Sequence, residues 1–360
     1  EHSNIATLDP AFASNPQLIW PTNQLFNSLV QLDDELNVQP DIAKNWTFND
    51  STLTYKFNLR NDVYFHKSEV FAGYYKDSIR LVTARDFEYS FNRLLDEKVA
   101  ARGSWVLNNA ARFYAENDST FKIELNQPFP AFLGLLSMRF CSVVPKEAID
   151  YYGNDFRSNP VGTGPFKFKR WEENIKLVFR KNNEYFQKDS IGNSLPYLES
   201  VAITFLQDKQ SEFLQFIQEN LDFVSGLDDS YKDEVVNTQG ELKNEYVNQI
   251  NLIRGPYLNT EYLAFYLDSN KNEIKSEILR KAVNHGFDRN KMIKYLRNGI
   301  GIPANGGFIP MGLPGYSDKI GYTYNPDYAK ELISQYKSDF KEIPSLKLTT
   351  TSNYLVFCEF

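Results

Sequence analysis

Residues 159–164 constrain the fold of this 360-residue chain more than any other segment. The segment concentrates Pro160, Gly162 and Gly164, and strand-like stretches follow it rather than a helix. It also lacks the Gly-Lys-Ser/Thr ending of a phosphate-binding loop. Glycines that free the backbone between strand regions fit a crossover between lobes, and a plain tight turn is the alternative. Because single cores stop growing near about 250–300 residues, the chain length favours two or more lobes.

Alternating apolar residues predict strands. In residues 54–60, Tyr55, Phe57 and Leu59 fall on one face, which is the period of a half-buried strand. The same pattern recurs in residues 120–125. Further strands are predicted at residues 166–170, 176–180, 200–205, 221–224, 262–267 and 346–351.

Helix signals accompany these strands. Thr83 can cap a helix in which Asp86 follows three positions later and Phe87 and Phe91 begin an apolar stripe. A proline at the first helical position marks another helix start at Asn325-Pro326. Further helices are predicted at residues 210–220, 276–286 and 289–298. An irregular segment at residues 9–23 is expected to be followed by a helix that carries Leu25, Phe26 and Leu29. Another helix is predicted at the chain end, with Tyr354, Val356 and Phe357 on its buried side.

Charge and composition exclude several classes of protein. The formal net charge is -7 and the basic residues are scattered, whereas phosphate-backbone binding needs clustered Lys and Arg. A nucleic-acid partner is therefore not expected. No apolar run approaches the roughly 18–20 residues needed to span a bilayer. Cys141 and Cys358 are too few to define a zinc site or a disulfide framework.

The residues that could carry catalysis are sparse. His2, His66 and His285 have no partners at metal-ligand spacing, and a structural role is favoured for each. No Gly-x-Ser-x-Gly nucleophile elbow occurs. Cys141 lies among apolar residues and is interpreted as a buried small hydrophobe. We therefore predict no catalytic residue, no metal site and no cofactor.

A set of short segments occurs in a fixed order along the chain. They are Leu8-Asp9-Pro10, Asn27-Ser28-Leu29-Val30, Gln39-Pro40-Asp41-Ile42-Ala43, Thr54-Tyr55-Lys56-Phe57-Asn58-Leu59-Arg60, Val82-Thr83-Ala84-Arg85-Asp86-Phe87 and Pro160-Val161-Gly162-Thr163-Gly164-Pro165-Phe166. Together they resemble the extracellular solute-binding proteins of family 5, the dipeptide/oligopeptide-binding receptors of ABC importers.

The resemblance implies an α/β fold of the two-lobed periplasmic-binding-protein type II, with an extra inserted α+β domain. Residues 1–43 and 163–256 would form a discontinuous lobe I with a mixed sheet, and residues 44–162 the inserted domain II. Residues 257–360 would open lobe III. Family members are longer, so we expect a chain truncated at its C-terminal side.

The resemblance also implies a ligand site in the cleft between lobes. The expected contacts are Ser14, Asn15, Trp105, Ser225, Gly226, Leu227, Asp228 and Tyr257, and the expected hinge is Gly162, Thr163 and Gly164. Each contact has a structural alternative. Ser14 and Asn15 could stabilise a turn, Trp105 could be core, and Asp228 could cap a helix.

The implied function is peptide capture by hinge closure and delivery to an ABC permease in the membrane. The protein is expected to be monomeric and periplasmic or at the cell surface, tethered by an N-terminal lipid anchor absent from this chain. One alternative keeps the fold and changes the ligand to a nickel chelate, an oligosaccharide, an opine or haem. Another is a ligand-sensing or chaperone-like domain without transport.

Overall fold

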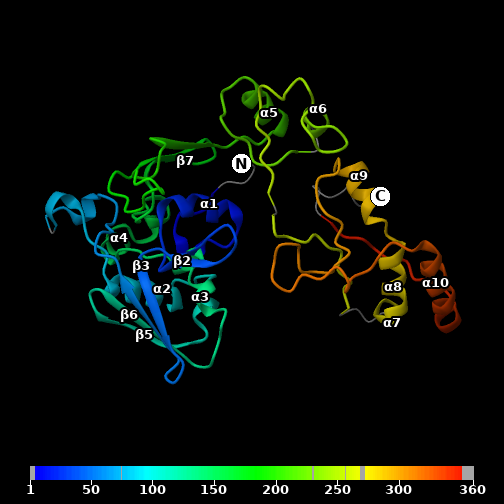
Figure 1. Cartoon of the computed structure of the whole chain (residues 1–360), viewed down its shortest axis with the longest axis horizontal. Helices are drawn as coiled ribbons and strands as arrows, with labels where there is room; N and C mark the ends of the chain where they lie inside the picture. Colours follow the sequence, from blue (N-terminus) through cyan, green and yellow to red (C-terminus); the bar gives the residue numbers. More distant parts are fainter. Residues whose placement is uncertain (1–4, 74, 229–230, 256, 268–271, 351–360) are drawn as a thin grey trace. The chain divides into compact units, whose positions relative to one another are not determined.

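The computed structural model describes residues 5–73, 75–228, 231–255, 257–267 and 272–350. Contacts divide the chain into two compact units, Glu1–Glu212 and Phe213–Phe360, here called the first and second unit. Figure 1 labels many of their helices and strands. The division at residue 212 does not test the predicted boundaries at residues 43, 162 and 256, which stay predictions.

The first unit contains an antiparallel sheet with strand order β3-β4-β6-β5. These strands are β3 (Ala43–Asn49), β4 (Thr54–Leu59), β5 (Ala110–Asn117) and β6 (Thr120–Leu125). The alternation predicted for residues 54–60 and 120–125 is confirmed, since inward residues of the two central strands are buried and Phe57 pairs with Phe121.

Helix α2 (Ala84–Leu95) packs on β5 and β6 through an aromatic cluster. The Phe87 ring lies 5.9 Å from that of Phe121, and the Phe91 ring lies 5.5 Å from the rings of Phe113 and Phe121. The helix start predicted at Thr83 is confirmed, because Thr83 and Asp86 form a capping box.

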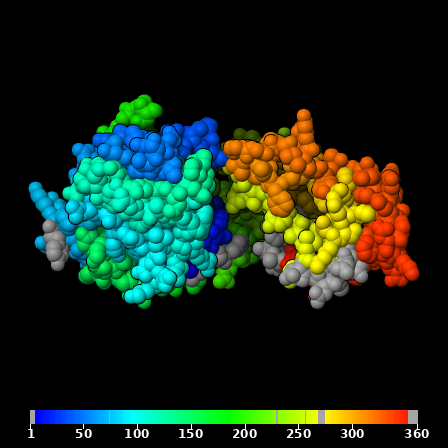
Figure 2. Space-filling view, turned by 90° about the horizontal axis from the view of Figure 1, so that it is seen from below, coloured from blue at the N-terminus to red at the C-terminus, as the bar shows by residue number. Residues whose placement is uncertain are grey.

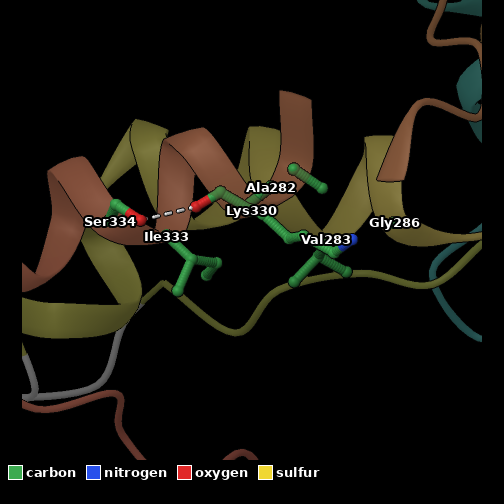
Figure 3. A pocket seen from close by; sticks show the side chains of 7 residues that line it. Ala282, Val283, Gly286, Lys330, Ile333 and Ser334 are labelled. Atoms are coloured by element: carbon green, nitrogen blue, oxygen red, sulfur yellow. Dashed lines mark hydrogen bonds between the residues drawn. The ribbon is translucent and has the colours of Figure 1, made fainter. Parts of the chain in front are cut away.

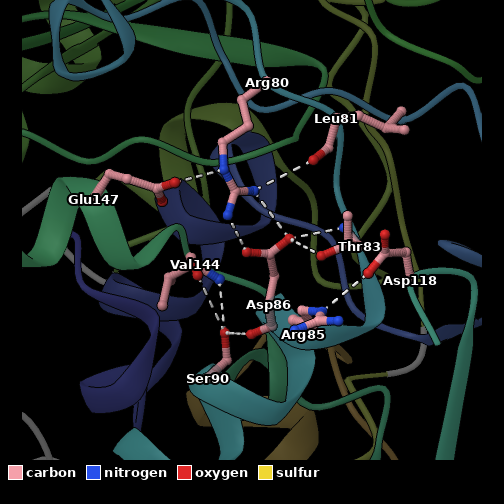
Figure 4. A network of polar contacts seen from close by, with 9 residues as sticks. All are labelled: Arg80, Leu81, Thr83, Arg85, Asp86, Ser90, Asp118, Val144 and Glu147. Atoms are coloured by element: carbon pink, nitrogen blue, oxygen red, sulfur yellow. Dashed lines mark hydrogen bonds and ion pairs between the residues drawn. The ribbon is translucent and has the colours of Figure 1, made fainter. Parts of the chain in front are cut away.

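The carboxylate of Asp86 also anchors a buried polar network (Figure 4). Its Oδ2 accepts from the Thr83 amide at 2.7 Å and from Arg80 Nη1 at 3.0 Å. Arg80 Nε donates to Glu147 Oε1 at 2.7 Å, and Glu147 lies on α4 (Lys146–Tyr152). The network therefore ties the loop before α2 to both helices.

A two-stranded sheet, β1 (Val30–Leu32) with β2 (Val38–Pro40), follows helix α1 (Pro16–Leu25). The helix predicted to carry Leu25, Phe26 and Leu29 is wrong, because α1 begins earlier and ends at Leu25. Asn15 caps α1, Pro16 occupies its first position, and Phe26 is already extended with φ -133° and ψ 155°.

The third sheet has the order β7-β8-β9, from β7 (Phe166–Glu172), β8 (Lys176–Lys181) and β9 (Ser200–Thr204). All three strands were predicted. One extended cluster of buried apolar residues fills the first unit and includes Phe26, Phe57, Phe121, Phe156 and Phe179. Short helix α3 (Phe132–Leu135) completes this unit, and α5 (Lys209–Ile217) crosses the boundary between units.

The described part of the second unit contains helices joined by long irregular segments. It contains α6 (Lys232–Val235), α7 (Asn272–Lys275), α8 (Glu277–Gly286), α9 (Arg289–Leu296) and α10 (Pro326–Phe340). The predicted helices near residues 276, 289 and 325 are confirmed. A small buried cluster near its start holds Phe213, whose ring stacks on Tyr231 at 4.6 Å.

The strands predicted at residues 221–224, 262–267 and 346–351 do not form among the described residues of this unit. A strand needs a hydrogen-bonded neighbour, and alternation alone does not supply one. Thr351 and the predicted helix at the chain end lie outside the described residues.

No helix in the described ranges is long and apolar enough to cross a membrane.

Residues 100–140, coloured cyan to green, form much of the visible surface of the first unit in Figure 2. This stretch contains one of the predicted contact residues, Trp105.

Candidate ligand-binding site

A buried ion pair between Asp9 and Arg93 fixes the start of the loop that carries Ser14 and Asn15. Asp9 Oδ1 accepts from the Ala11 amide at 3.1 Å and from Arg93 Nη1 of α2 at 3.0 Å. Both charged side chains are largely buried, with exposed fractions of 5% and 13%. The loop is therefore fixed to α2 before it reaches the surface at Ser14.

Ser14 and Asn15 are exposed, and each forms a hydrogen bond. Asn15 Oδ1 accepts from the Leu18 amide at 3.1 Å, which is the turn-stabilising role named as the alternative for this residue. Ser14 Oγ lies 3.4 Å from Arg102 Nη1, which donates to it. Arg102 was missed by the sequence reasoning, because nothing in its local pattern connects it to a residue 88 positions away.

Trp105 is presented on a rigid support. It lies in a 3-10 helix, Ser104–Leu107, where Val106 and Leu107 are buried and the Trp105 side chain is 48% exposed. Gly103 allows the backbone before this 3-10 helix to lie against the Phe140 ring, because a Cβ on Gly103 would lie 2.0 Å from that ring. The alternative that Trp105 is core is wrong, and an exposed ring on a buried support suits a ligand contact.

The predicted crossover, Gly162-Thr163-Gly164, is tightly packed. A Cβ on Gly162 would lie 1.9 Å from the Leu25 carbonyl oxygen, and one on Gly164 would lie 2.5 Å from that of Gln24. The Gly164 amide donates to the Leu25 carbonyl at 2.9 Å, and Thr163 Oγ1 donates to Asn27 Oδ1 at 3.0 Å. The two glycines thus allow close approach of two backbones.

His66 holds the same segment from the other side. Its Nε2 lies 3.0 Å from the Gly164 carbonyl oxygen, and its Nδ1 accepts from the Gly162 amide at 3.3 Å. This geometry requires a neutral ring protonated at Nε2. Burial lowers the pKa of His66 from 6.5 to about 4, which agrees with that state. The predicted structural role of His66 is confirmed.

A buried carboxylate supports Asn27 beneath this segment. Asp41 accepts from Asn27 Nδ2 at 3.0 Å and from the Ser28 amide at 3.0 Å, and Gln187 donates to it at 3.2 Å. Burial raises the pKa of Asp41, while the charge of Arg139 opposes that rise. The motif residues Asn27, Ser28 and Asp41 therefore form one structural unit under Thr163.

Four predicted contacts, Ser225, Gly226, Leu227 and Asp228, lie on a turn of the second unit. The Gly226 carbonyl accepts from Tyr231 Oη at 3.1 Å, and φ at Gly226 is +81°, a conformation that favours glycine. The Asp228 carbonyl accepts from the amides of Tyr231 and Lys232 at the start of α6. Ser225 is exposed, while Leu227 packs against the small buried cluster.

Tyr257 is 73% exposed. The predicted contacts are thus divided between the units: Ser14, Asn15 and Trp105 in the first, and Ser225–Asp228 with Tyr257 in the second. Contact of all eight with one ligand stays a prediction.

Helices α8 and α10 enclose an apolar groove of about 450 Å³ within the second unit (Figure 3). Ala282, Val283 and Gly286 line it from α8, and Ala329 and Ile333 line it from α10. Gly286 faces Ala329, because a Cβ on Gly286 would lie in ordinary van der Waals contact with the Ala329 methyl group at 3.8 Å. None of the predicted contacts lies in this groove.

His285 and Cys141 have structural surroundings. His285 Nδ1 lies 2.9 Å from the Thr323 carbonyl oxygen. Cys141 is buried as predicted, and burial raises the pKa of its thiol to about 12. The described ranges contain no group of three or more His, Cys, Asp or Glu side chains that could hold a metal ion. His2 and Cys358 lie outside the described residues.

Comparison with known proteins identifies relatives along almost the whole chain. Residues 37–354 match the model of the bacterial extracellular solute-binding proteins, family 5 Middle. Glutathione-binding protein GsiB of Salmonella typhimurium is 22% identical over 333 residues, which cover 92% of this chain and 60% of that protein. "Probable di/tripeptide-binding protein 5" of Pseudomonas aeruginosa is 27% identical over 343 residues, covering 91% and 60%.

Solved structures share the fold. The periplasmic binding protein DppA from Helicobacter pylori, in complex with the peptide STSA, matches with a TM-score of 0.75 and 25% identity, covering 92% of this chain and 64% of that chain. The predicted fold class, a type II periplasmic binding protein, is confirmed. This chain spans about 60% of the length of the curated relatives it matches.

Proposed function

Because this chain belongs to the bacterial extracellular solute-binding proteins of family 5, we propose that it captures small peptides as the substrate-binding component of an ABC importer. The observation that carries the proposal is the likeness to the H. pylori protein, whose structure contains the peptide STSA. The di/tripeptide-binding relative of P. aeruginosa agrees with this ligand class. Family 5 proteins are binding proteins rather than enzymes, and this chain is proposed to catalyse nothing.

In this proposal, Ser14, Asn15, Arg102 and Trp105 form the part of the ligand site that the first unit supplies. An exposed indole and a guanidinium suit an extended peptide, which offers side chains to stack and carbonyl oxygens to accept hydrogen bonds. Ser225, Gly226, Leu227, Asp228 and Tyr257 would supply contacts from the second unit.

Gly162, Thr163 and Gly164 are retained as the proposed hinge, at the crossover between the inserted domain and lobe I. Their hydrogen bonds to Leu25, Asn27 and His66 anchor the segment at this position. Ligand capture needs a closed state that the ligand prefers, because equal affinity for open and closed states shifts neither population.

The protein is proposed to act in the periplasm or at the cell surface, tethered by an N-terminal lipid anchor, as a monomer that delivers its ligand to an ABC permease. Native mass spectrometry of the protein purified from its own host, followed by denaturing release, tests the ligand class. We expect a mixture of short peptides. A single non-peptide mass, such as haem or a nickel chelate, would keep the fold and overturn the peptide assignment.

The contact proposed for Trp105 has a matched control in Trp20. Both lie in the first unit with similar exposed fractions, 48% and 44%. We expect Trp105→Ala to weaken peptide affinity about tenfold or more, the scale of a lost aromatic contact, and Trp20→Ala to leave it unchanged. Titration with the peptides recovered from the host protein measures both. Equal affinities for the two variants would remove Trp105 from the site.

A further inference from the structure

A small polar cavity lies against the crossover segment of the first unit, with a volume of about 140 Å³. Residues from four separate stretches of the chain line it: Lys67 and Ser68 from the loop after His66, Tyr152 from the end of α4, Asn159–Val161, and Lys167 with Phe168 from β7. It contains none of the residues proposed to bind peptide.

Two lysines, Lys67 and Lys167, are among the residues that line this cavity. Neither Lys67 nor Lys167 forms an ion pair or a side-chain hydrogen bond with any residue in the described ranges. Lys167 is half-buried on β7, while Lys67 is more exposed. Burial is the main cause that lowers the pKa of the buried His66, and the positive charge of Lys167 lowers that pKa further.

The neighbouring polar groups leave both ammonium groups available. Glu69, the adjacent carboxylate in the sequence, accepts from Tyr152 Oη at 3.4 Å. The Asn159 amide nitrogen donates to the Asp155 carbonyl at 3.0 Å. Ser68 Oγ accepts from the Val70 amide at 3.4 Å.

We propose that this cavity, lined by Lys67, Ser68 and Lys167, binds a small doubly charged oxyanion such as inorganic phosphate or sulfate. Two ammonium groups balance two negative charges, and the Ser68 hydroxyl adds a neutral donor. Val161, Pro160 and Phe168 provide apolar walls, beside which the attraction between the half-buried Lys167 and an anion is stronger than in water. Bound anion would connect the loop after His66 to β7 on the two sides of the crossover.

Titration of inorganic phosphate into the full chain, followed by ³¹P NMR line width at constant ionic strength set with chloride, tests the site. We expect saturable broadening that sulfate reverses. Lys67→Ala and Lys167→Ala are each expected to weaken phosphate binding about tenfold or more, as the loss of a charge-assisted contact predicts. The double variant Lys67→Arg/Lys167→Arg keeps both cations and should retain binding.

Lys169→Ala is the matched control, because Lys169 lies two residues from Lys167 on β7, is exposed and does not line the cavity. It should bind phosphate like the unmodified protein. An equal loss of phosphate affinity in Lys169→Ala and Lys167→Ala would show only a general attraction of the anion to a positive surface, and it would overturn the proposed site. The absence of any saturable broadening would also overturn it. The experiment needs no peptide, so its failure leaves the proposed function untouched.

Discussion

At the scale of the residue, His66 shows how one buried imidazole can fix a backbone. It accepts from the Gly162 amide at Nδ1 and contacts the Gly164 carbonyl at Nε2, so that both ring nitrogens are used. A protonated ring would have a donor at each nitrogen and could no longer accept from Gly162. The first unit therefore depends on this ring remaining neutral.

This dependence predicts a stability change with pH. The pKa of His66 is about 4 in the fold against 6.5 in the unfolded chain, so between these values only the unfolded state binds the proton. The contribution of neutral His66 to the free energy of unfolding is fully present above pH 6.5. It is lost as the pH falls towards about 4, and the total loss is roughly 3 kcal/mol.

The urea midpoint followed by tryptophan fluorescence measures this effect, because all four tryptophans, Trp20, Trp46, Trp105 and Trp171, lie in the first unit. His66→Gln should lower the midpoint at neutral pH and reduce its fall towards acid. His285→Gln in the second unit should leave this transition unchanged. If the urea midpoint of His66→Gln depended on pH as it does in the unmodified protein, the neutral His66 ring would not be the cause of the acid sensitivity.

Gly162 provides a steric test of the same segment. Its φ is not in the left-handed region, so a substitution there is resisted by contact with the Leu25 carbonyl, 1.9 Å from the added Cβ. We expect Gly162→Ala to destabilise the first unit by about 3 kcal/mol or more through overpacking. Gly134→Ala is the control, because no atom lies within 4 Å of its added Cβ. Equal urea midpoints would contradict the packing described for the crossover.

At the scale of the element, α2 is fixed both by its own sequence and by its partners. Thr83 and Asp86 define its start locally, while Arg80 and Glu147 connect that start to α4. The Arg80 and Asp86 side chains are only 12% and 3% exposed. Removal of Arg80 therefore leaves the Asp86 carboxylate buried without its cation, and removal of Asp86 leaves the buried Arg80 with Glu147 as its remaining ionic partner.

Asp86→Ala is therefore expected to destabilise the first unit by about 3 kcal/mol or more. The control is Asp118→Ala, which breaks the Arg85–Asp118 pair at the same end of α2, where both side chains are more than 70% exposed. That pair should contribute less than about 1 kcal/mol. Urea unfolding of both variants, followed by tryptophan fluorescence, gives the comparison, and similar losses would show that burial is not what strengthens the Arg80 network.

At the scale of the whole molecule, the two units differ in the size of their cores. An extended cluster of buried apolar residues fills the first unit. The second unit has a small cluster around Phe213 and Tyr231 and a few buried residues on α8 and α10, such as Leu279, Leu332 and Tyr336. Buried apolar area is the main source of stability, so the second unit should unfold first.

Hydrogen exchange measured by mass spectrometry at neutral pH tests this expectation. Amides of α8 and α10 should exchange faster than those of β4 and β6. Urea should remove the part of the helical circular dichroism that α8, α9 and α10 contribute before it changes tryptophan fluorescence. Coincident transitions for the two probes would indicate that the units unfold as one.

The sequence by itself determined the elements whose signals are local. The alternation of Tyr55, Phe57 and Leu59 predicted β4, and the spacing of Thr83, Asp86 and Phe87 predicted α2, because both depend on residues close in the chain. The ordered motifs likewise identified the family and its fold before any contact was known.

Only the tertiary structure decided which distant residues meet. The pairs Ser14–Arg102 and His66–Gly162 join positions 88 and 96 residues apart, and no local pattern records such contacts. The same limit explains the strands that were predicted at residues 221–224 and 262–267 but do not form. An apolar segment of this length can be buried as a strand, but a strand exists only when a second segment pairs with its backbone.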